Sequence, residues 1–408
     1  MKKVLHEKGF TQLVSIAPLR LRTLARRMLP SRREVWLISD RLLKANDSGE
    51  CLFAYLSRKK PAGVKPYFVL EKGSPDYARL KRVGHVVDPN SRKYRKLFLV
   101  AKRVVSSSFD PHVYRCFGSE ERYYAGLYGF SFVFLQHGVI KDDMSRILSK
   151  DKKNIALFVT SAKRERESIL SPAYGYRPEE VLLCGLPRFD LRLQGNSQPE
   201  KKIVIFPTWR NSLVSGFEAN TDRAIIDTAN LQKSDYYRNW SKVLASEKLE
   251  VAMKETGYRL VFAMHPGFSE IAHLFKGSDV VNVLEGFDYE ILYETGSVFV
   301  TDYSTAIFDA ALLKKPLAYF QFDRDEVIEG GSHITKRGYF DFQEDGFGPV
   351  FEEADDLVDW LCEAMHEASE VRMDSVYERR VDDFFFVPPK GVPRCELLTD
   401  AVMGLEQR

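Results

Sequence analysis

The chain has 408 residues, of which 44% are hydrophobic and 29% are charged, and this composition is typical of a soluble globular protein. The formal net charge of +3 gives no overall basic character, so we expect no nucleic acid among the partners. Because 408 residues exceed a single ordinary hydrophobic core, we expect two domains of about 150–200 residues each.

The N-terminal segment, residues 1–33, is strongly basic. It holds nine lysines and arginines against one acidic residue, Glu7. Apolar side chains lie among them at roughly helical spacing: Leu19, Leu21, Leu24, Met28 and Leu29. Two interpretations stay open: a basic amphipathic helix on the inner surface of the cell membrane, and a surface helix packed on its own domain. Because the sequence has no signal peptide and no run of about 20 apolar residues, we expect a cytoplasmic protein, peripheral to the membrane in the first interpretation.

Strand and helix patterns alternate from residue 34 onwards. In the first half, apolar β-branched and aromatic runs predict strands at 34–39, 65–70, 103–106, 132–135, 155–160 and 181–184. Amphipathic stretches between them predict helices at 51–59, 94–102 and 163–170. Strands separated by helices of this length indicate parallel βαβ units.

A polar stretch at 192–202 is the best linker candidate, and the alternation restarts after it. The expected strands are 202–206, 259–264, 280–284 and 297–300, and the expected helices lie near 240–256, 289–295 and 355–369. The predicted fold class is therefore α/β, with two Rossmann-like doubly wound domains that face each other across a cleft. We place the domains at 34–195 and 200–380, and we expect the tail, 381–408, to pack near their junction.

Five cysteines are scattered along the chain: Cys51, Cys116, Cys184, Cys362 and Cys395. No two of them have the spacing of a Cys-x-x-Cys motif. The sequence therefore predicts neither a zinc site nor a disulfide framework.

Polar residues gather where the predicted strands end, and ligands of open parallel sheets bind at that edge. These residues are Gln136, His137, Gly138, Arg188, Arg210 and His265. Taken singly, each of them fits an ordinary structural role, such as a surface ion pair or a turn. Because two histidines and two arginines follow strands in both halves of the chain, we expect them to converge on one cleft.

The segment 298–323 carries the strongest local signal. An expected strand runs into a polar loop whose Ser304 and Thr305 we expect to cap a helix, and that helix ends before Pro316. A further strand then leads to Asp323. The start of a helix presents backbone N–H groups and a positive dipole end to an anion, so this loop is the first candidate for a phosphate site.

These motifs together resemble the CDP-glycerol glycerophosphotransferase family, whose members build teichoic acid and related polyol-phosphate polymers. The matching motifs are Gln136-His137-Gly138, Gly185-Leu186-Pro187-Arg188, Pro207-Thr208-Trp209-Arg210, His265-Pro266, Thr301-Asp302-Tyr303-Ser304-Thr305 and Arg337-Gly338. The resemblance implies a glycosyltransferase-B type fold with an acceptor-side domain at 34–195 and a nucleotide-donor domain at 200–380. It also implies transfer of glycerol phosphate, or a similar polyol phosphate, from a CDP-alcohol to a hydroxyl of a cell-wall, teichoic acid or capsule precursor, with release of CMP.

The resemblance further implies roles for single residues. His137 is expected to act as the general base on the acceptor hydroxyl, and His265 is the second expected catalytic residue. Some residues are expected to bind the donor by neutralising phosphate charge, and others are expected to orient these charge-neutralising groups. The expected donor-binding residues are Arg210, Ser304, Thr305, Asp309, Asp323 and Arg337. Acceptor-side candidates are Gln136, Gly138, Lys141 and Arg188. For Asp309 and Asp323 the alternative is a helix-start acid and a strand-end turn residue.

Several alternatives stay open at this point. Some relatives have Trp-His-Gly-Thr where this chain has Gln136-His137-Gly138-Val139, so the acceptor, expected to be a lipid-linked saccharide or polymer, is not fixed. The donor polyol can be glycerol or ribitol. An Asp-x-Asp triplet such as Asp323-Arg324-Asp325 often occurs by chance, so no metal site is expected. The possibility of a magnesium ion that accompanies the nucleotide stays open. Two other functions remain: a nucleotide-sugar-dependent glycosyltransferase of the same fold, and a catalytically silent nucleotide- or glycan-binding protein.

Overall fold

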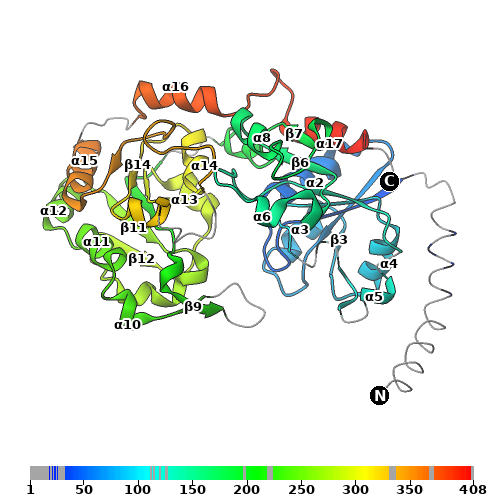
Figure 1. Ribbon diagram of the computed structural model, residues 1–408, viewed down its shortest axis with the longest axis horizontal. Helices are drawn as coiled ribbons and strands as arrows, with labels where there is room; N and C mark the ends of the chain where they lie inside the picture. Colours follow the sequence, from blue (N-terminus) through cyan, green and yellow to red (C-terminus); the bar gives the residue numbers. More distant parts are fainter. Residues whose placement is uncertain are drawn as a thin grey trace, which may run out of the picture.

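The computed structural model describes residues 18, 21, 23, 25, 33–110, 113, 115–118, 121–124, 127–195, 199–217, 224–329, 337–366 and 372–405. These residues form two parallel β-sheets that lie side by side, each covered by helices (Figure 1). Apart from residues 18, 21, 23, 25 and 33, the prediction for the basic segment 1–33 lies outside the described residues. Among the helices that the structure describes, none combines the length and the apolar character that a membrane-spanning segment needs.

The N-terminal sheet has seven parallel strands in the order β3-β2-β1-β4-β5-β6-β7. The strands are β1 (Glu34–Ser39), β2 (Val64–Val69), β3 (Val86–Val87), β4 (Arg103–Ser106), β5 (Ser131–Phe134), β6 (Leu157–Thr160) and β7 (Val181–Leu183). The six strands predicted from the sequence are confirmed to within two residues at each end. Strand β3 was missed, because a run of two residues is too short to show a period.

Helices connect these strands and cover the sheet. They are α2 (Ser48–Lys59), α3 (Tyr77–Val83), α4 (Arg92–Val100), α5 (Glu121–Tyr124), α6 (Ser145–Leu148), α7 (Lys150–Lys153), α8 (Lys163–Ile169) and α9 (Phe189–Arg192). Helix α2 begins at Asp47, whose side chain accepts the N–H of Ser48 at 2.6 Å, and it ends at Lys60 in the left-handed conformation. Its buried face includes Leu52 and Phe53, which anchor the helix on the sheet.

The C-terminal sheet has six parallel strands in the order β12-β11-β8-β13-β14-β15. The strands are β8 (Lys202–Phe206), β11 (Arg259–Ala263), β12 (Val281–Leu284), β13 (Val298–Thr301), β14 (Leu317–Phe320) and β15 (Val350–Phe351), and a separate hairpin is formed by β9 (Val214–Phe217) and β10 (Ala224–Ile226). Numbered within its own domain, this is the order 3-2-1-4-5-6 of a doubly wound dinucleotide-binding sheet. The expected α/β fold with two Rossmann-like domains is confirmed.

The helices of the second half are α10 (Thr228–Leu231), α11 (Asp235–Leu244), α12 (Glu247–Thr256), α13 (Tyr289–Thr295), α14 (Ile307–Leu312), α15 (Ala354–His366), α16 (Ser375–Phe384) and α17 (Arg394–Met403), and a 3-10 segment spans Pro266–Leu274. The single helix predicted near 240–256 is wrong, since it is two helices, α11 and α12. The Ser246 hydroxyl between them accepts the N–H of Leu249 at 3.3 Å and starts a new helix.

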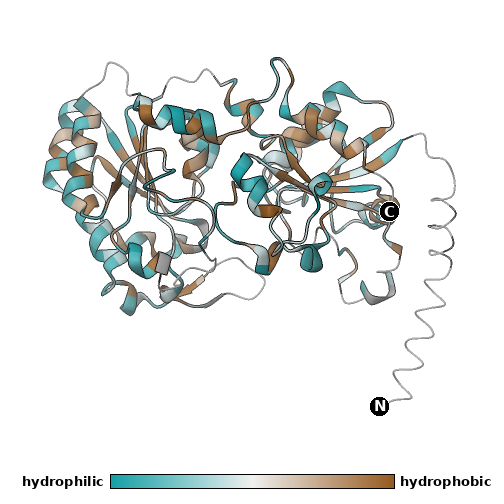
Figure 2. Cartoon of the chain, turned by 45° about the horizontal axis from the view of Figure 1, so that its top comes forward, coloured by the Kyte–Doolittle hydropathy of each residue, from teal (hydrophilic) through white to brown (hydrophobic). Residues whose placement is uncertain are grey.

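Apolar strands fill the interior of each domain, and the helices turn their polar faces outwards (Figure 2). The C-terminal tail contacts both domains. The ring of Phe384 packs 5.2 Å from Phe347 in the second domain, whereas the ring of Phe385 packs 5.9 Å from Phe189 in the first. Helix α17 then packs on α2 and α9, so the chain returns to its first domain.

Candidate active site

Both sheets reverse their strand order next to their first strand. In the N-terminal sheet β1 lies between β2 and β4, and in the C-terminal sheet β8 lies between β11 and β13. Open parallel sheets bind ligands in the crevice outside the carboxyl ends of the strands at such a reversal. The loops after β1, β4, β8 and β13 therefore frame the candidate active site.

Arg210, in the loop after β8, is enclosed by acidic side chains at the ends of two neighbouring strands. Its guanidinium pairs with Asp302 at 2.9 Å and with Asp323 at 2.7 Å, and Asp323 also accepts the hydroxyl of Tyr303 at 3.1 Å. Burial by itself lowers the pKa of Arg210, but the two carboxylates outweigh it and raise that pKa above the ordinary value. Two residues predicted from the sequence, Arg210 and Asp323, are thus brought together as an ion pair that holds the strand-end loops in place.

His265 follows β11, the strand next to β8, and its side chain is exposed. Its Nδ1 accepts the backbone N–H of Gly267 at 3.1 Å, so the neutral ring carries its proton on Nε2. The ring of Phe268 lies 5.7 Å from that of Trp209. This contact places the His265 loop against the loop that carries Arg210.

Ser304 and Thr305 lie between β13 and α14 and are half-buried. The prediction that they cap the helix is wrong, because the residue before its first turn is Ala306, whose side chain makes no capping hydrogen bond. The Ser304 hydroxyl instead accepts the N–H of Ala306 at 3.2 Å, and the Ser304 N–H donates to Thr301 Oγ1 at 3.2 Å. Because the amides of Ser304 and Ala306 already have acceptors, the side-chain groups that the loop offers to a ligand are the hydroxyls of Ser304 and Thr305.

His137 stands in the loop after β5. Gln136 before it adopts a left-handed backbone with φ 62° and is held there by a hydrogen bond from its Nε2 to the Val159 carbonyl. The Nδ1 of His137 lies 3.3 Å from the carbonyl oxygen of Ser107, so the neutral ring holds its proton on Nδ1 and Nε2 carries the lone pair. The side chain reaches solvent, yet the surrounding protein removes enough water from the imidazolium form to lower its pKa.

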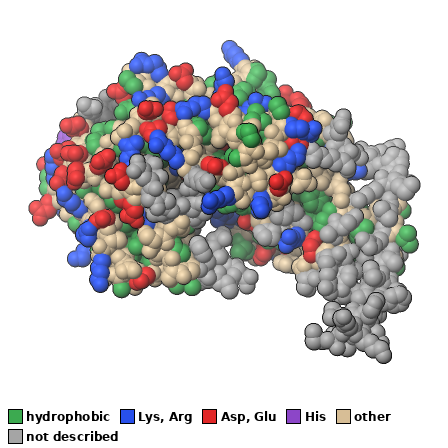
Figure 3. Space-filling model, in the orientation of Figure 1, with side chains coloured by type: hydrophobic (Ala, Val, Ile, Leu, Met, Phe, Trp, Pro, Cys, Tyr) green, Lys and Arg blue, Asp and Glu red, His purple; other side chains and the backbone are tan. Residues whose placement is uncertain are grey.

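The His137 loop meets the second domain directly. A Cβ atom added to Gly138 would lie 3.2 Å from Oγ1 of Thr305, and one added to Gly338 would lie 2.1 Å from the carbonyl oxygen of Lys141. The loops that carry His137 and Thr305 therefore face each other across the domain boundary. In the space-filling view, a notch opens between the two domains at the lower side of the molecule (Figure 3).

Lys141 and Arg337, two basic residues predicted for the site, differ in their exposure to solvent. Lys141 is buried, with its ammonium 2.6 Å from Asp142, so it stabilises its own loop. Arg337 is exposed and pairs with Asp341 at 2.8 Å. An exposed ion pair is worth only about 0–1 kcal/mol, so a phosphate can compete for Arg337.

Glu165 hydrogen-bonds to the loop that carries His137, and the sequence did not predict it as a site residue. Its carboxylate is fully buried and accepts the N–H groups of Ile140 at 2.7 Å, Ser161 at 2.5 Å and Ala162 at 3.3 Å. Burial raises its pKa to about 7, against the opposing effect of these hydrogen bonds. A glutamate near the start of a helix has no distinctive sequence signal, because its partners lie in two separate loops.

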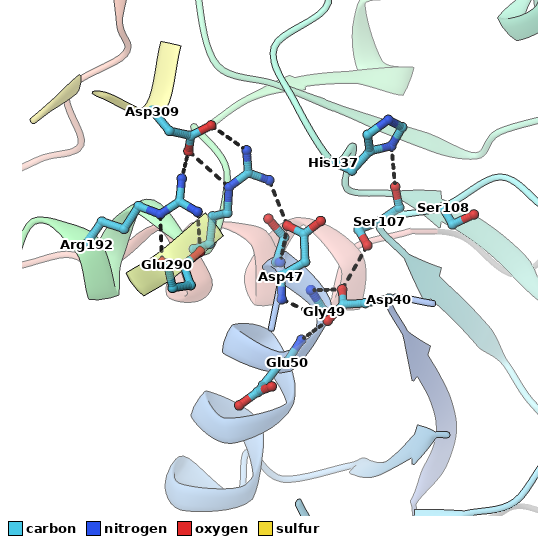
Figure 4. A network of polar contacts seen from close by, with 12 residues as sticks. Asp40, Asp47, Gly49, Glu50, Ser107, Ser108, His137, Arg192, Glu290 and Asp309 are labelled. Atoms are coloured by element: carbon cyan, nitrogen blue, oxygen red, sulfur yellow. Dashed lines mark hydrogen bonds and ion pairs between the residues drawn. The ribbon is translucent and has the colours of Figure 1, made fainter. Parts of the chain in front are cut away.

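A buried ion network joins the domains beside this loop (Figure 4). Arg188 forms a bidentate pair with Asp309, at 3.1 and 2.9 Å, and its third nitrogen lies 2.7 Å from Asp47. Arg192 pairs with the same Asp309 and with Glu290. Two predicted site residues, Arg188 and Asp309, are therefore brought together, although their charged groups are largely paired with each other. Asp47, Arg192 and Glu290 were missed, since only folding places them near Asp309.

The described residues contain no group of three or more histidine, cysteine, aspartate or glutamate side chains arranged to hold a metal ion. Asp323, the first member of the Asp-x-Asp triplet, is engaged by Arg210. All five cysteines are free thiols.

Comparison with known proteins identifies relatives of this chain. A family model described as CDP-glycerol:poly(glycerophosphate) glycerophosphotransferase matches residues 21–386. The minor teichoic acid biosynthesis protein GgaB of Bacillus subtilis (strain 168) is 36% identical over 363 residues, which are 88% of this chain and 39% of that protein. The teichoic acid poly(ribitol-phosphate) polymerase of Bacillus spizizenii (strain W23) is 27% identical over 242 residues, 58% of this chain and 36% of that protein. The chain thus spans less than half the length of these curated relatives.

A solved structure shares the fold. The wall teichoic acid polymerase TagF superimposes with a TM-score of 0.63 at 18% sequence identity, over 98% of this chain and 97% of the TagF chain. A variant of TagF soaked with CDPG superimposes with a TM-score of 0.61. At this level of identity the likeness concerns the two-domain architecture.

Proposed function

The chain belongs to the CDP-glycerol:poly(glycerophosphate) glycerophosphotransferase family, and we propose that it transfers glycerol phosphate, or a similar polyol phosphate, from a CDP-linked donor to a hydroxyl of a teichoic acid or related cell-wall precursor, releasing CMP. The observation that carries the proposal is the approach of the His137 loop to the Thr305 hydroxyl across the domain boundary. One domain then supplies a base for the acceptor, and the other supplies hydrogen-bond donors for the pyrophosphate.

In this reaction the acceptor oxygen attacks the phosphorus that bears the polyol, and the bond from that phosphorus to the bridging oxygen breaks. CMP leaves with the bridging oxygen, and the hydroxyl proton passes to Nε2 of His137. The Ser107 carbonyl beside Nδ1 supports this direction, because it fixes the tautomer whose Nε2 accepts a proton. The lowered pKa favours the neutral ring, which is the form that accepts a proton.

The donor side works by positioning and by charge neutralisation. His265 has the opposite tautomer to His137, so its Nε2–H suits donation to a phosphate oxygen. The hydroxyls of Ser304 and Thr305 add donors, and Arg337 adds positive charge at the rim. Arg210 contributes by holding its loop, because two carboxylates occupy its guanidinium.

The setting of the reaction is part of the proposal. We place the chain on the cytoplasmic side of the cell membrane, with a lipid-linked saccharide or polymer as acceptor. The basic residues of the segment 1–33 support contact with an anionic bilayer. The teichoic acid relatives support the acceptor class.

The test is nucleotide release by the purified full-length chain. CDP-glycerol, CDP-ribitol and a set of UDP-sugars are each supplied with a lipid-linked saccharide, and CMP and UDP are measured. We expect CMP from a CDP-polyol and no UDP, and we expect His137→Ala to reduce CMP release at least about 100-fold, as the loss of a general base does. The matched control is His366→Ala, since His366 bonds to the Cys362 carbonyl near the end of α15. UDP release, or full activity of His137→Ala, would exclude the proposal.

A further inference from the structure

The buried ion network between the domains gathers charged residues at the starts of four helices. The first domain supplies Asp47 before α2 and Arg188 before α9, and the second domain supplies Glu290 in the first turn of α13 and Asp309 in the first turn of α14. Figure 4 shows the side chain of Arg192, also from α9, between Glu290 and Asp309. Because each of these helices follows a strand, the network connects the carboxyl edges of the two sheets.

Arg188 uses each of its three guanidinium nitrogens on a carboxylate. Its Nε and Nη2 donate to the two oxygens of Asp309 at 3.1 and 2.9 Å, and its Nη1 donates to Asp47 at 2.7 Å. Arg188 is 5% exposed and Asp309 is 2% exposed. A bidentate pair allows a narrow range of distances and angles, and a buried charge without its partner is strongly unfavourable. Domains in one chain move relative to each other by default, so this pair restricts that motion.

Asp309 is part of the same rigid piece as the donor loop. In the first turn of α14, the N–H groups of Ile307 and Phe308 donate to the carbonyl oxygens of Ser304 and Thr305 at 3.4 and 3.2 Å. The loop and the start of the helix are therefore joined by backbone hydrogen bonds. A displacement of Asp309 would also displace the two hydroxyls that the loop offers to a ligand.

Arg188 and His137 are both anchored to the end of β6. The side chain of Gln136 donates to the carbonyl oxygen of Val159 in that strand. The backbone N–H of Gly185, in the loop that leads to Arg188, donates to the carbonyl oxygen of the next strand residue at 3.0 Å. The guanidinium and the imidazole are thus fixed to the same part of the N-terminal sheet.

We propose that Arg188 is a positioning residue for the transfer reaction: by pairing with Asp309, it holds the donor loop at the distance from His137 that transfer requires. For its role in turnover, the inference rests on the proposed function. The base and the phosphate-binding hydroxyls belong to different domains, so contact between the domains sets their separation, and the rate of transfer depends steeply on such a separation. Because carboxylates already occupy its three nitrogens, Arg188 acts through the domain boundary and not by binding the acceptor.

The first perturbation is Arg188→Lys in the full-length chain. Lysine keeps the positive charge but has a single ammonium group in place of the planar fork, so it loses the bidentate pair with Asp309. The matched control is Arg103→Lys, since Arg103 is also buried and donates to the carbonyl oxygens of Val402 at 3.2 Å and Leu405 at 2.6 Å. Arg103 stands at the start of β4, so it lies at the edge of the sheet opposite to the candidate active site.

A second variant, Asp309→Asn, breaks the same pair from the other side. Arg188 keeps Asp47 as a partner and Arg192 keeps Glu290, so neither arginine is left as an unpaired buried charge and the fold is preserved. We expect Asp309→Asn and Arg188→Lys to have the same effects.

The first readout is independent of turnover. Spin labels on Lys96→Cys of α4 and Lys248→Cys of α12, both exposed positions, report the distance between the domains by pulsed electron paramagnetic resonance. The background carries Cys116→Ser, because the other four cysteines are buried. We expect the distribution of this distance to widen in Arg188→Lys and Asp309→Asn and to stay unchanged in Arg103→Lys.

The second readout separates positioning from substrate binding. In both variants of the pair, kcat for CMP release with a lipid-linked saccharide should fall about 100-fold, as a displacement of about 1 Å between reacting groups causes. The Kd for CDP-glycerol by calorimetry and the KM for the acceptor should stay constant, because neither binding site loses a contact. Arg103→Lys should keep the parent kcat.

Several results would overturn the inference: an unchanged distance distribution, an unchanged kcat, or an equal loss of kcat in Arg103→Lys. A weaker affinity for CDP-glycerol, or a higher KM for the acceptor, would assign the pair to substrate binding and would overturn it as well. A widened distance distribution in a protein that releases no CMP from any donor would support the connection between the domains and would overturn the transferase function itself.

Discussion

Gly338 lies where the two domains touch, and replacing it with alanine should misalign the candidate active site. Its added Cβ would come within 2.1 Å of the Lys141 carbonyl oxygen and within 2.7 Å of the Asp142 Cα. Real contacts of this kind stay beyond 3.0 Å, so the two backbones must separate by about 0.9 Å, and neither atom belongs to a flexible side chain. Lys141 shares a loop with His137. A shift of about 1 Å between reacting groups costs about 100-fold in rate, and overpacking costs about 1–3 kcal/mol of stability.

Two measurements on Gly338→Ala test this reasoning. CMP release gives kcat, which should fall about 100-fold, and urea unfolding gives the free energy of unfolding, which should fall by about 1–3 kcal/mol. The control is Gly73→Ala, because a Cβ at Gly73 meets nothing within 4 Å. We expect that control to stay within about 0.5 kcal/mol of the parent and to keep its activity. If Gly338→Ala matches the parent in both rate and stability, the tight contact between the domains does not exist in solution.

Two further predictions concern buried charges. Burial raises the pKa of Glu165 from 4.5 to about 7, so the folded chain holds this proton to higher pH than the unfolded chain and loses up to about 3 kcal/mol of stability as the pH rises from 4.5 to 7. Urea unfolding at pH 5 and pH 7.5 should show that the free energy of unfolding falls less over this range in Glu165→Gln than in the parent. Equal losses of unfolding free energy in the two proteins would contradict the raised pKa of Glu165. Arg210→Met leaves Asp302 and Asp323 without their shared partner, so we expect a loss of about 3–5 kcal/mol. The exposed pair of Arg238 gives the comparison, since Arg238→Met should cost at most about 1 kcal/mol, and similar losses in the two variants would refute the argument.

The sequence predicted the strands well because buried parallel strands are short, continuous apolar runs, and few surface segments share that pattern. Six strands of the first sheet fall within two residues of their predicted bounds. The helix after β13 was predicted less well. Ser304 and Thr305 have the residue types of a cap, but the chain uses Ser304 for a turn onto Ala306 and starts the helix later. Local preference alone cannot decide between two hydrogen bonds that the same hydroxyl can make.

The sequence predicted the site residues that follow strands, but it did not predict the residues that hold the strand-end loops in place. Arg210, His265 and His137 carry the signal of position, since each lies within four residues of the end of a predicted strand. Asp47 and Glu165 carry no such signal, because one is an ordinary helix cap and the other an ordinary helix acid. Their importance comes from partners far away in the chain.

The sequence by itself determined which side chains stand at the carboxyl edges of the two sheets, because each strand ends where its continuous apolar run ends. Only the tertiary structure decided what each charge faces. Arg188 could have met a phosphate or a carboxylate, and it is the packing of α2, α9 and α14 that brings Asp47 and Asp309 to it. Electrostatic interactions in a protein depend on distance and burial, and neither quantity is written in the order of the residues.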